Sequence, residues 1–199
     1  MIVLRGGLEI QDPLAATLRF VEAYPGYDAS DSRPSSFDER DLRHANRGGA
    51  RISAAQIATV LERRRRIERA LRSIAPEASL ADADDSIPWR SLTRLFDTFA
   101  DISGVGFSKM TKALHPKRRA LIPLLDSVVQ AYLATDEPRP ASFGERATAM
   151  LGSYKHDLDL NLDALRQVKR ELVRHGYRPL TEVRILDVLV WSAHAPARR

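Results

Sequence analysis

Apolar side chains recur at the spacing of α-helices along most of this chain, and this periodicity restricts the fold more than any other feature. The clearest case is the segment 53–74, where Ser53 is a favourable N-cap ahead of a long apolar stripe. The stripe consists of Ile57, Val60, Leu61, Ile67, Leu71 and Ile74. The pattern predicts one amphipathic helix over 53–74. Four arginines, Arg63–Arg66, lie within it, and we expect a solvated face with Arg64 on the apolar stripe, paired to an acid; the alternative is a second ridge of phosphate contacts.

Capping and breaking residues divide the rest of the chain into further helices. Asp12-Pro13 is typical of a helix start, Pro25-Gly26 of a stop, and Gly176 of a C-cap. The predicted helices cover 13–24, 37–46, 89–99, 126–133, 142–151, 157–174 and a segment beginning at Thr181. The first ten residues form either a short hairpin around Gly6-Gly7 or an irregular lead-in. The sequence therefore predicts an all-α protein with seven to nine helices.

The length and the apolar content are sufficient for one packed domain. The chain has 199 residues, of which 44% are hydrophobic, so a substantial core is available. We predict a single helical domain with three parts: residues 1–90 as an N-terminal helical part, 91–135 as a core with a hairpin and an aspartate, and 136–199 as C-terminal helices.

Composition excludes several classes of site. The chain has no cysteine, which rules out disulfides, cysteine zinc sites and iron–sulfur clusters. No two of the five histidines are three or four residues apart, so no local metal motif is present and no metal is expected.

No stretch approaches a membrane span, and we expect a soluble, cytoplasmic protein. The net charge of +5 favours a polyanionic partner.

Residues 102–126 contain the pattern that bears on function. Gly104-Val105-Gly106 separates two apolar stretches and precedes a predicted helix. Glycines let the backbone approach a phosphate closely, and the free N–H groups at a helix start point at the anion. We therefore predict that this turn and the cations after it bind DNA phosphates. The predicted phosphate-binding residues are Gly104, Gly106, Ser108, Lys109, Lys112, Lys117 and Arg118. Ordinary solvated lysines and an exposed basic turn are the alternative interpretation.

One acid, Asp126, closes this segment where the 126–133 helix begins. Aspartate is a favoured N-cap, so this position has a purely structural explanation. The helix dipole also favours the ionised carboxylate at such a position. Asp126 is thus a candidate catalytic acid, a helix cap, or both.

The segment Ile102–Leu114 resembles the helix-hairpin-helix motif of the DNA glycosylase superfamily, whose members include endonuclease III and the adenine-mismatch glycosylases. In that superfamily a catalytic aspartate follows in a Pro-x-x-Asp segment at a helix start. Here Pro123-Leu124-Leu125-Asp126 fits that segment, and Asp126 lies 126 − 108 = 18 residues after Ser108, which matches the spacing in the superfamily. Parts of 110–127 and of 180–187 look even more like a divergent bacterial branch of the same superfamily.

This resemblance implies that the protein binds double-stranded DNA. It also implies a monofunctional DNA glycosylase that hydrolyses the N-glycosidic bond of a damaged or modified base, with Asp126 as the catalytic carboxylate. Ser108 occupies the position of the catalytic lysine in bifunctional members, which argues against lyase activity. Met110 departs from the small residue usual at its position. No cofactor is expected.

A base that reacts in this way has to leave the stack and enter an aromatic or apolar pocket. The candidates that we considered for that pocket are Trp89, Phe107, Tyr132 and Tyr154. Two other functions stay open: the same fold bound to duplex DNA without hydrolysis, and a structural protein that no longer binds DNA.

Overall fold

The computed structural model describes residues 1–28, 32–134 and 142–194. Within these ranges the chain forms ten α-helices, three 3-10 turns and one small sheet, which confirms the all-α class. The helices are α1 (Pro13–Ala23), α2 (Glu39–Arg47), α3 (Ala54–Glu62), α4 (Arg64–Arg72), α5 (Trp89–Asp97), α6 (Phe107–Leu114), α7 (Ser127–Tyr132), α8 (Phe143–Leu160), α9 (Leu162–Arg174) and α10 (Glu182–His194). The 3-10 turns are η1 (Arg5–Gly7), η2 (Asp84–Ser86) and η3 (His115–Lys117).

The first ten residues form the hairpin, not the irregular lead-in. Strands β1 (Ile2–Val3) and β2 (Glu9–Ile10) pair antiparallel, with Ile2 opposite Ile10. The side chain of Asn161, between α8 and α9, accepts a hydrogen bond from the Val3 amide and donates one to the Val3 carbonyl, both at 2.9 Å. A buried side chain therefore fastens the N-terminal hairpin to the junction of α8 and α9.

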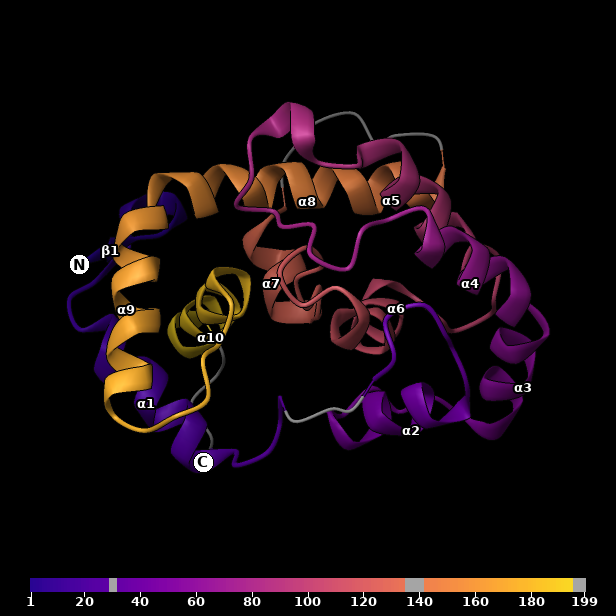
Figure 1. Cartoon of the computed structure of the whole chain (residues 1–199), viewed down its shortest axis with the longest axis horizontal. Coiled ribbons are helices and arrows are strands. Elements are labelled where there is room, and N and C mark those ends of the chain that lie inside the picture. The colour runs from indigo at the N-terminus through magenta and orange to yellow at the C-terminus, as the bar shows by residue number, and fades with distance from the viewer. Residues whose placement is uncertain (29–31, 135–141, 195–199) are drawn as a thin grey trace.

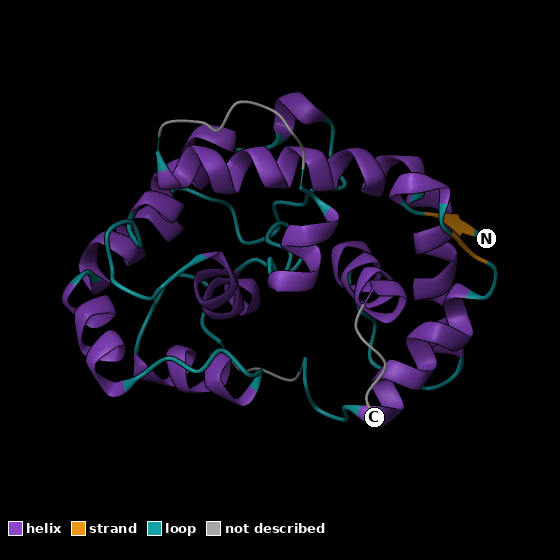
Figure 2. Ribbon diagram, turned by 180° about the vertical axis from the view of Figure 1, so that it is seen from behind, coloured by secondary structure: helices purple, strands orange, loops and turns teal. Residues whose placement is uncertain are grey.

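Two groups of helices lie side by side and share one long helix. In Figure 1, α1, α9 and α10 gather at one end of the molecule, and α2, α3, α4 and α6 gather at the other. Helix α8 runs along one edge, as Figure 2 shows from behind. One cluster of buried apolar residues extends from Ile2 to Val190 and includes members of both groups.

The predicted helix 53–74 is interrupted at Arg63. Helix α3 ends at Glu62 and α4 begins at Arg64, because the Arg63 guanidinium turns inward and donates to the carbonyls of Thr98 and Ala100. The break rotates the arginine run. Arg64 is therefore exposed and not on the apolar stripe, although its predicted pairing with an acid is confirmed by Glu68 at 2.9 Å.

In the C-terminal part, by contrast, one helix is longer than predicted. Helix α8 continues through Gly152 to Leu160, where two separate helices were predicted with a gap at 152–156. Its buried stripe has unbroken helical spacing, which explains the continuity; the stripe consists of Ala147, Leu151, Tyr154 and Leu158. The predicted boundary between 135 and 136 lies outside the described residues. Among the described residues, no helix combines the length and apolarity needed to cross a membrane.

Helices α5 and α8 approach each other so closely that only glycine fits at position 144. A Cβ atom there would collide with the carbonyl oxygen of Thr93 and with the Asp97 side chain. The Gly144 amide also donates to Asp97 Oδ1 at 2.7 Å. Gly152 lies two turns further along the same helix, and a Cβ atom there would meet nothing within 4 Å.

We therefore expect opposite effects from the same substitution in one helix. Gly144→Ala should lower the free energy of unfolding by about 1–3 kcal/mol, because the two helices must move apart. Gly152→Ala should raise it by roughly 0.5–1 kcal/mol, because alanine favours the helix. Urea denaturation of the two variants measures both values. Equal effects would show that α5 and α8 are not in close contact at position 144.

Candidate functional site

The glycine hairpin lies exposed between α5 and α6. Gly104 has φ +72°, a left-handed conformation that favours glycine, and the Val105 amide donates to the Ile102 carbonyl at 3.0 Å to close the turn. Val105 is buried, whereas Gly104 and Gly106 are exposed. Gly106 is the N-cap of α6 and supplies no side-chain cap. The first amide groups of α6 are therefore without the capping acceptor that most helices have.

Lys109 is held in place by a residue of α3. Its Nζ donates to Gln56 Oε1 at 2.8 Å, and Gln56 Nε2 donates to the Ser103 carbonyl at 3.1 Å. Ser108 lies in the first turn of α6 and is partly buried. Gln56 thus braces both the turn and the lysine, and the hairpin presents Gly106, Ser108 and Lys109 together.

Lys117 and Arg118, two of the predicted phosphate contacts, are buried instead. Lys117 Nζ lies 2.7 Å from Asp41 Oδ1, with the lysine side chain 1% exposed. The Arg118 guanidinium donates to the carbonyls of Pro34, Leu71, Ile74 and Lys117. Both cations are buried and already bonded inside the molecule, Arg118 through Nη1 and Nη2, so neither is available for a phosphate and the prediction for them was wrong.

Asp126 is both a helix cap and part of a pocket. Its Oδ1 accepts from the amides of Val128 and Val129 at 3.0 and 3.1 Å, which caps α7. Both of these hydrogen bonds use Oδ1, and Oδ2 accepts none from the described residues. The cap therefore uses one oxygen and leaves the other for a ligand.

The Asp126 pocket is a cavity of about 210 Å³ between the two groups of helices. Four aromatic rings line it: Phe20, Tyr24, Tyr27 and Trp191. The Trp191 ring packs edge-on at 6.1 Å from both Phe20 and Tyr24. The other lining residues are Gly48, Lys112, Leu124, Asp126, Val129, Arg184, Asp187 and Val188. The volume is below the roughly 300–1,000 Å³ of drug-sized sites, so one flat ring system fits better than a large ligand.

None of the aromatic residues that we considered from the sequence lines this pocket. Tyr154 is buried and donates to the Val183 carbonyl, and Tyr132 accepts from the Arg5 amide. The Phe107 ring packs against that of Phe143, and the Trp89 indole N–H donates to the Asp84 carbonyl. The sequence did contain a signal: Phe20, Tyr24 and Tyr27 recur at intervals of four and three, at the end of α1.

Arg184 of α10 organises the wall of the pocket. It is 5% exposed, and its Nε lies 2.7 Å from Asp28 Oδ1. Its guanidinium also lies over the rings of Phe20 and Tyr27, at 5.0 and 4.9 Å from their centroids. A buried cation that stacks on two rings and pairs with an acid holds those rings in fixed positions.

The pocket contains a second carboxyl group, Asp187. Burial raises the pKa of Asp187 to about 7. Its Oδ2 accepts from the Leu124 amide at 3.0 Å, whereas its Oδ1 is buried and has no hydrogen-bond partner among the described residues. Two carboxyl groups in one pocket thus lie in contrasting environments, one at a helix N-terminus and one inside the core.

Lys112 extends into the pocket from α6, four residues after Ser108. Burial lowers the pKa of the Lys112 amine, and the nearby Asp126 carboxylate opposes that effect. The amine makes no hydrogen bond or ion pair with the described residues. Of the predicted phosphate-binding cations, Lys112 therefore belongs to the pocket and Lys109 to the hairpin.

The Asp126 pocket has the components to hold a flat ring between aromatic side chains, beside a carboxylate and an amine. In the described part of the chain, no group of three or more acidic, histidine or cysteine side chains could hold a metal ion.

The described residues thus define an all-helical protein with an aromatic, charged pocket next to an exposed glycine hairpin. The chain belongs to a family of unknown function, DUF6308, whose model matches residues 12–194. No curated protein and no solved structure matches the chain significantly. The family description names no activity.

The buried carboxyl group of Asp187 predicts a specific pH dependence of stability. Its pKa is about 7 in the folded chain and about 3.9 when unfolded, so unfolding releases a proton between these values. Its contribution to the free energy of unfolding therefore falls as the pH rises from about 4 to 7. His115 acts in the opposite direction, because burial lowers its pKa to about 4.

The substitution Asp187→Asn removes the titration of Asp187 and leaves that of His115 in place. We expect the free energy of unfolding of the wild type, relative to this variant, to fall by up to about 1.4 kcal/mol per pH unit between pH 4.5 and 6.5. Urea denaturation of both proteins across this range measures the difference. A difference that is independent of pH would contradict the burial of a protonated Asp187.

Proposed function

We propose that this protein binds double-stranded DNA through its 104–109 hairpin and hydrolyses the N-glycosidic bond of a damaged or modified base with Asp126. One observation carries the proposal: Asp126, at the spacing after the hairpin that the glycosylase resemblance requires, lines an aromatic pocket with one carboxylate oxygen unused by its cap. A cap without chemistry does not require such a pocket.

The hairpin has the properties of a phosphate-binding turn. Gly106 is exposed, α6 begins without a side-chain cap, and Lys109 lies in the first helical turn. Backbone amides, a hydroxyl and a lysine bind the DNA backbone without reading its sequence. In this proposal such contacts position the duplex, and the pocket selects the base.

The pocket supports the chemistry of base removal. A base that has left the stack lies among the four rings, where its flat face is covered. As the bond between base and sugar breaks, the Asp126 carboxylate stabilises the positive charge that develops on the sugar. Water then adds to the sugar carbon and yields its proton, and the departing base takes up a proton.

Lys112 contributes a cation beside the Asp126 carboxylate. Its amine belongs to the pocket rather than to the position of the superfamily's catalytic lysine, which is Ser108 here. The proposal is therefore for hydrolysis without a covalent amine intermediate, and it includes no strand cleavage.

DNA binding without hydrolysis is the alternative, and the cap of α7 favours it. Both amide contacts of Asp126 are those of an ordinary N-cap, and aspartate is common in that position for structural reasons alone. The two functions differ in a single measurable product, the abasic site.

Asp126→Asn tests the catalytic role. Asparagine also caps helices, so we expect normal folding and normal duplex binding. Formation of abasic sites should fall by about 10²–10³-fold, because a charge-stabilising group is lost. A panel of duplexes with modified bases, followed by alkaline cleavage, measures the product. Asp12→Asn, which changes the N-cap of α1 away from the pocket, is the matched control.

Two results would contradict the enzymatic proposal while leaving the binding proposal in place. One is an Asp126→Asn variant as active as the wild type. The other is a wild-type protein that forms no abasic site across the panel. Trapping of a covalent complex by borohydride would contradict the absence of an amine intermediate.

Gly106→Ala tests the hairpin. A Cβ atom at Gly106 meets nothing within 4 Å, so the variant should fold, but the methyl group blocks close approach of a phosphate. With Lys109→Gln added, we expect duplex affinity to fall about tenfold or more and the salt dependence to weaken by about one unit of log K per log salt. Fluorescence anisotropy at several salt concentrations measures both, and Arg170→Gln on the exposed face of α9 is the control. Unchanged binding would exclude the hairpin as the DNA contact.

A further inference from the structure

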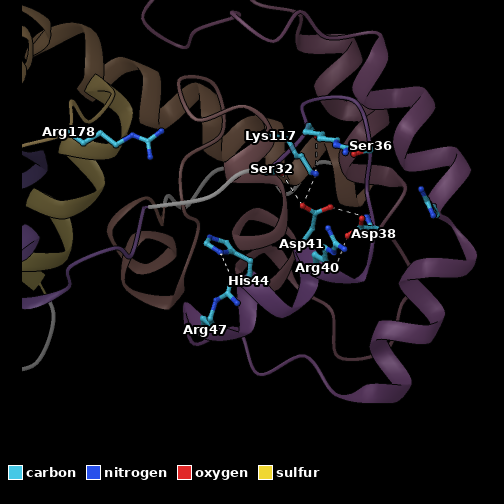
Figure 3. Close-up of a pocket in the computed structure, with 11 residues that line it drawn as sticks. Ser32, Ser36, Asp38, Arg40, Asp41, His44, Arg47, Lys117 and Arg178 are labelled. Atoms are coloured by element: carbon cyan, nitrogen blue, oxygen red, sulfur yellow. Dashed lines mark hydrogen bonds and ion pairs between the residues drawn. The ribbon is translucent and has the colours of Figure 1, made fainter.

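A second, larger cavity lies beside α2 and carries excess positive charge. It measures about 710 Å³, and we call it the α2 cavity. Its basic lining comes from Arg33, Arg40, Arg47, Arg64, Lys117 and Arg178. Figure 3 shows Arg40 and Arg47 on α2, with Arg178 facing them from the segment between α9 and α10. The cavity therefore lies between the two groups of helices, as the Asp126 pocket does.

Few of these cations are neutralised within the protein. Lys117 is paired with Asp41, and Arg64 is paired with Glu68. By contrast, the side chains of three arginines form no ion pair with any described residue. These three are Arg33, Arg40 and Arg178.

Arg47 adds a further cation to the α2 cavity, beside the ring of His44. The Arg47 guanidinium contacts the ring of His44, Nη2 to Nδ1 at 3.1 Å. Burial, and next the Arg47 charge, lower the pKa of His44, so its ring is neutral at pH 7 and can accept from Arg47. The one acid of the lining besides the paired Asp41 is Asp38, whose Oδ1 accepts from the Arg40 amide. The cavity thus keeps an excess of guanidinium groups that face solvent.

Guanidinium groups suit phosphate better than other anions or apolar ligands. Each presents a planar fork of N–H donors that matches phosphate oxygens, and arginine is only weakly hydrated. Side chains supply these donors, since the N-terminus of α2 is already closed by the Asp38–Asp41 capping box. The chemistry points to a ligand with several phosphates.

The α2 cavity and the Asp126 pocket both share wall residues with a third, smaller hollow. This narrow depression lies between them, and His44 borders both it and the α2 cavity. Tyr27, Gly48 and Lys112 border both the depression and the Asp126 pocket. The three hollows therefore lie next to one another, in a row from the arginines to the carboxylate, and we call this row the path.

Helix α6 relates this path to the hairpin. It begins at the hairpin, carries Lys112 into the Asp126 pocket, and ends at η3, whose Lys117 borders the α2 cavity. Its eight residues span about 12 Å at ~1.5 Å per residue. That length corresponds to about three to four nucleotides of one strand, at ~3.4 Å each.

We propose that the α2 cavity binds the phosphate backbone of the DNA strand whose base enters the Asp126 pocket. The hairpin binds that strand on one side of the extruded nucleotide, and Arg40, Arg47 and Arg178 bind it on the other. This inference rests on the proposed DNA-binding function and adds to it a second phosphate contact, on helices that the glycine hairpin does not include.

The test compares two triple variants that lose the same charge. The first is Arg40→Gln, Arg47→Gln and Arg178→Gln in the α2 cavity. The control is Arg90→Gln, Arg94→Gln and Arg170→Gln, three exposed arginines that line neither cavity. Circular dichroism and urea denaturation check that both fold. The probe is a fluorescein-labelled duplex with one abasic-site analogue, measured by anisotropy over a range of salt concentrations.

We expect the cavity variant to lose about two to three units from the slope of log K against log salt, at ~0.9 per phosphate contact. Its affinity at 0.1 M salt should fall by more than tenfold, while the control stays within about twofold of the wild type.

The outcomes separate this inference from the proposed function. If the wild type and the Gly106→Ala, Lys109→Gln variant show the expected binding difference but the cavity variant binds like the control, the α2 cavity is not a DNA contact and the inference fails alone. If the wild type itself binds duplex without salt dependence, the proposed function fails first.

Discussion

Two buried cations between α6 and α7 hold the site together. Lys117 is paired with Asp41 of α2, and Arg118 donates to the carbonyls at the end of α4 and to that of Pro34. A buried charge without partners costs several kcal/mol, so these contacts leave the segment little freedom. The chain that follows leads to Leu124 and Asp126. The position of the carboxylate in its pocket therefore depends on two buried cations that are already bonded within the protein.

Buried charges also hold the walls of the Asp126 pocket together. Arg184 holds Asp28 and the rings of Phe20 and Tyr27 in place, although these residues come from the opposite end of the chain. Asp187, next to it on α10, stays inside the core through its bond to the Leu124 amide. Both interactions join α10 to segments that also line the pocket. The aromatic walls and the carboxylate are thus parts of one packed unit.

Helix α6 gives the proposed function its geometry. The hairpin precedes α6, Lys112 lies within the helix, and Lys117 of η3, which follows α6 directly, borders the α2 cavity. A DNA strand on this path would have its backbone bound at both ends and one base in the middle. The family of unknown function to which the chain belongs supplies no such assignment, and the arrangement of charges and rings is what supports it.

The sequence by itself determined most of the helices and the local chemistry of the hairpin. Caps such as Asp12 and Ser53 mark helix starts through hydrogen bonds within a few residues, and the structure has both. The glycine turn and Asp126 were likewise identified from local spacing, because a cap and a turn depend on nearby atoms.

Only the tertiary structure decided which charges are available and which rings meet. Lys117 and Arg118 look like solvated cations in the sequence, but the Asp41 carboxylate and the carbonyls of Leu71 and Ile74 that bind them lie more than forty residues away. The break at Arg63 also depends on distant carbonyls, those of Thr98 and Ala100. The rings of Phe20, Tyr27 and Trp191 come together only when α1 packs on α10. Local sequence patterns indicate the propensity to form a helix or a turn. The partners of a buried charge and the walls of a pocket instead come from residues far apart in the sequence, which only the folded chain brings together.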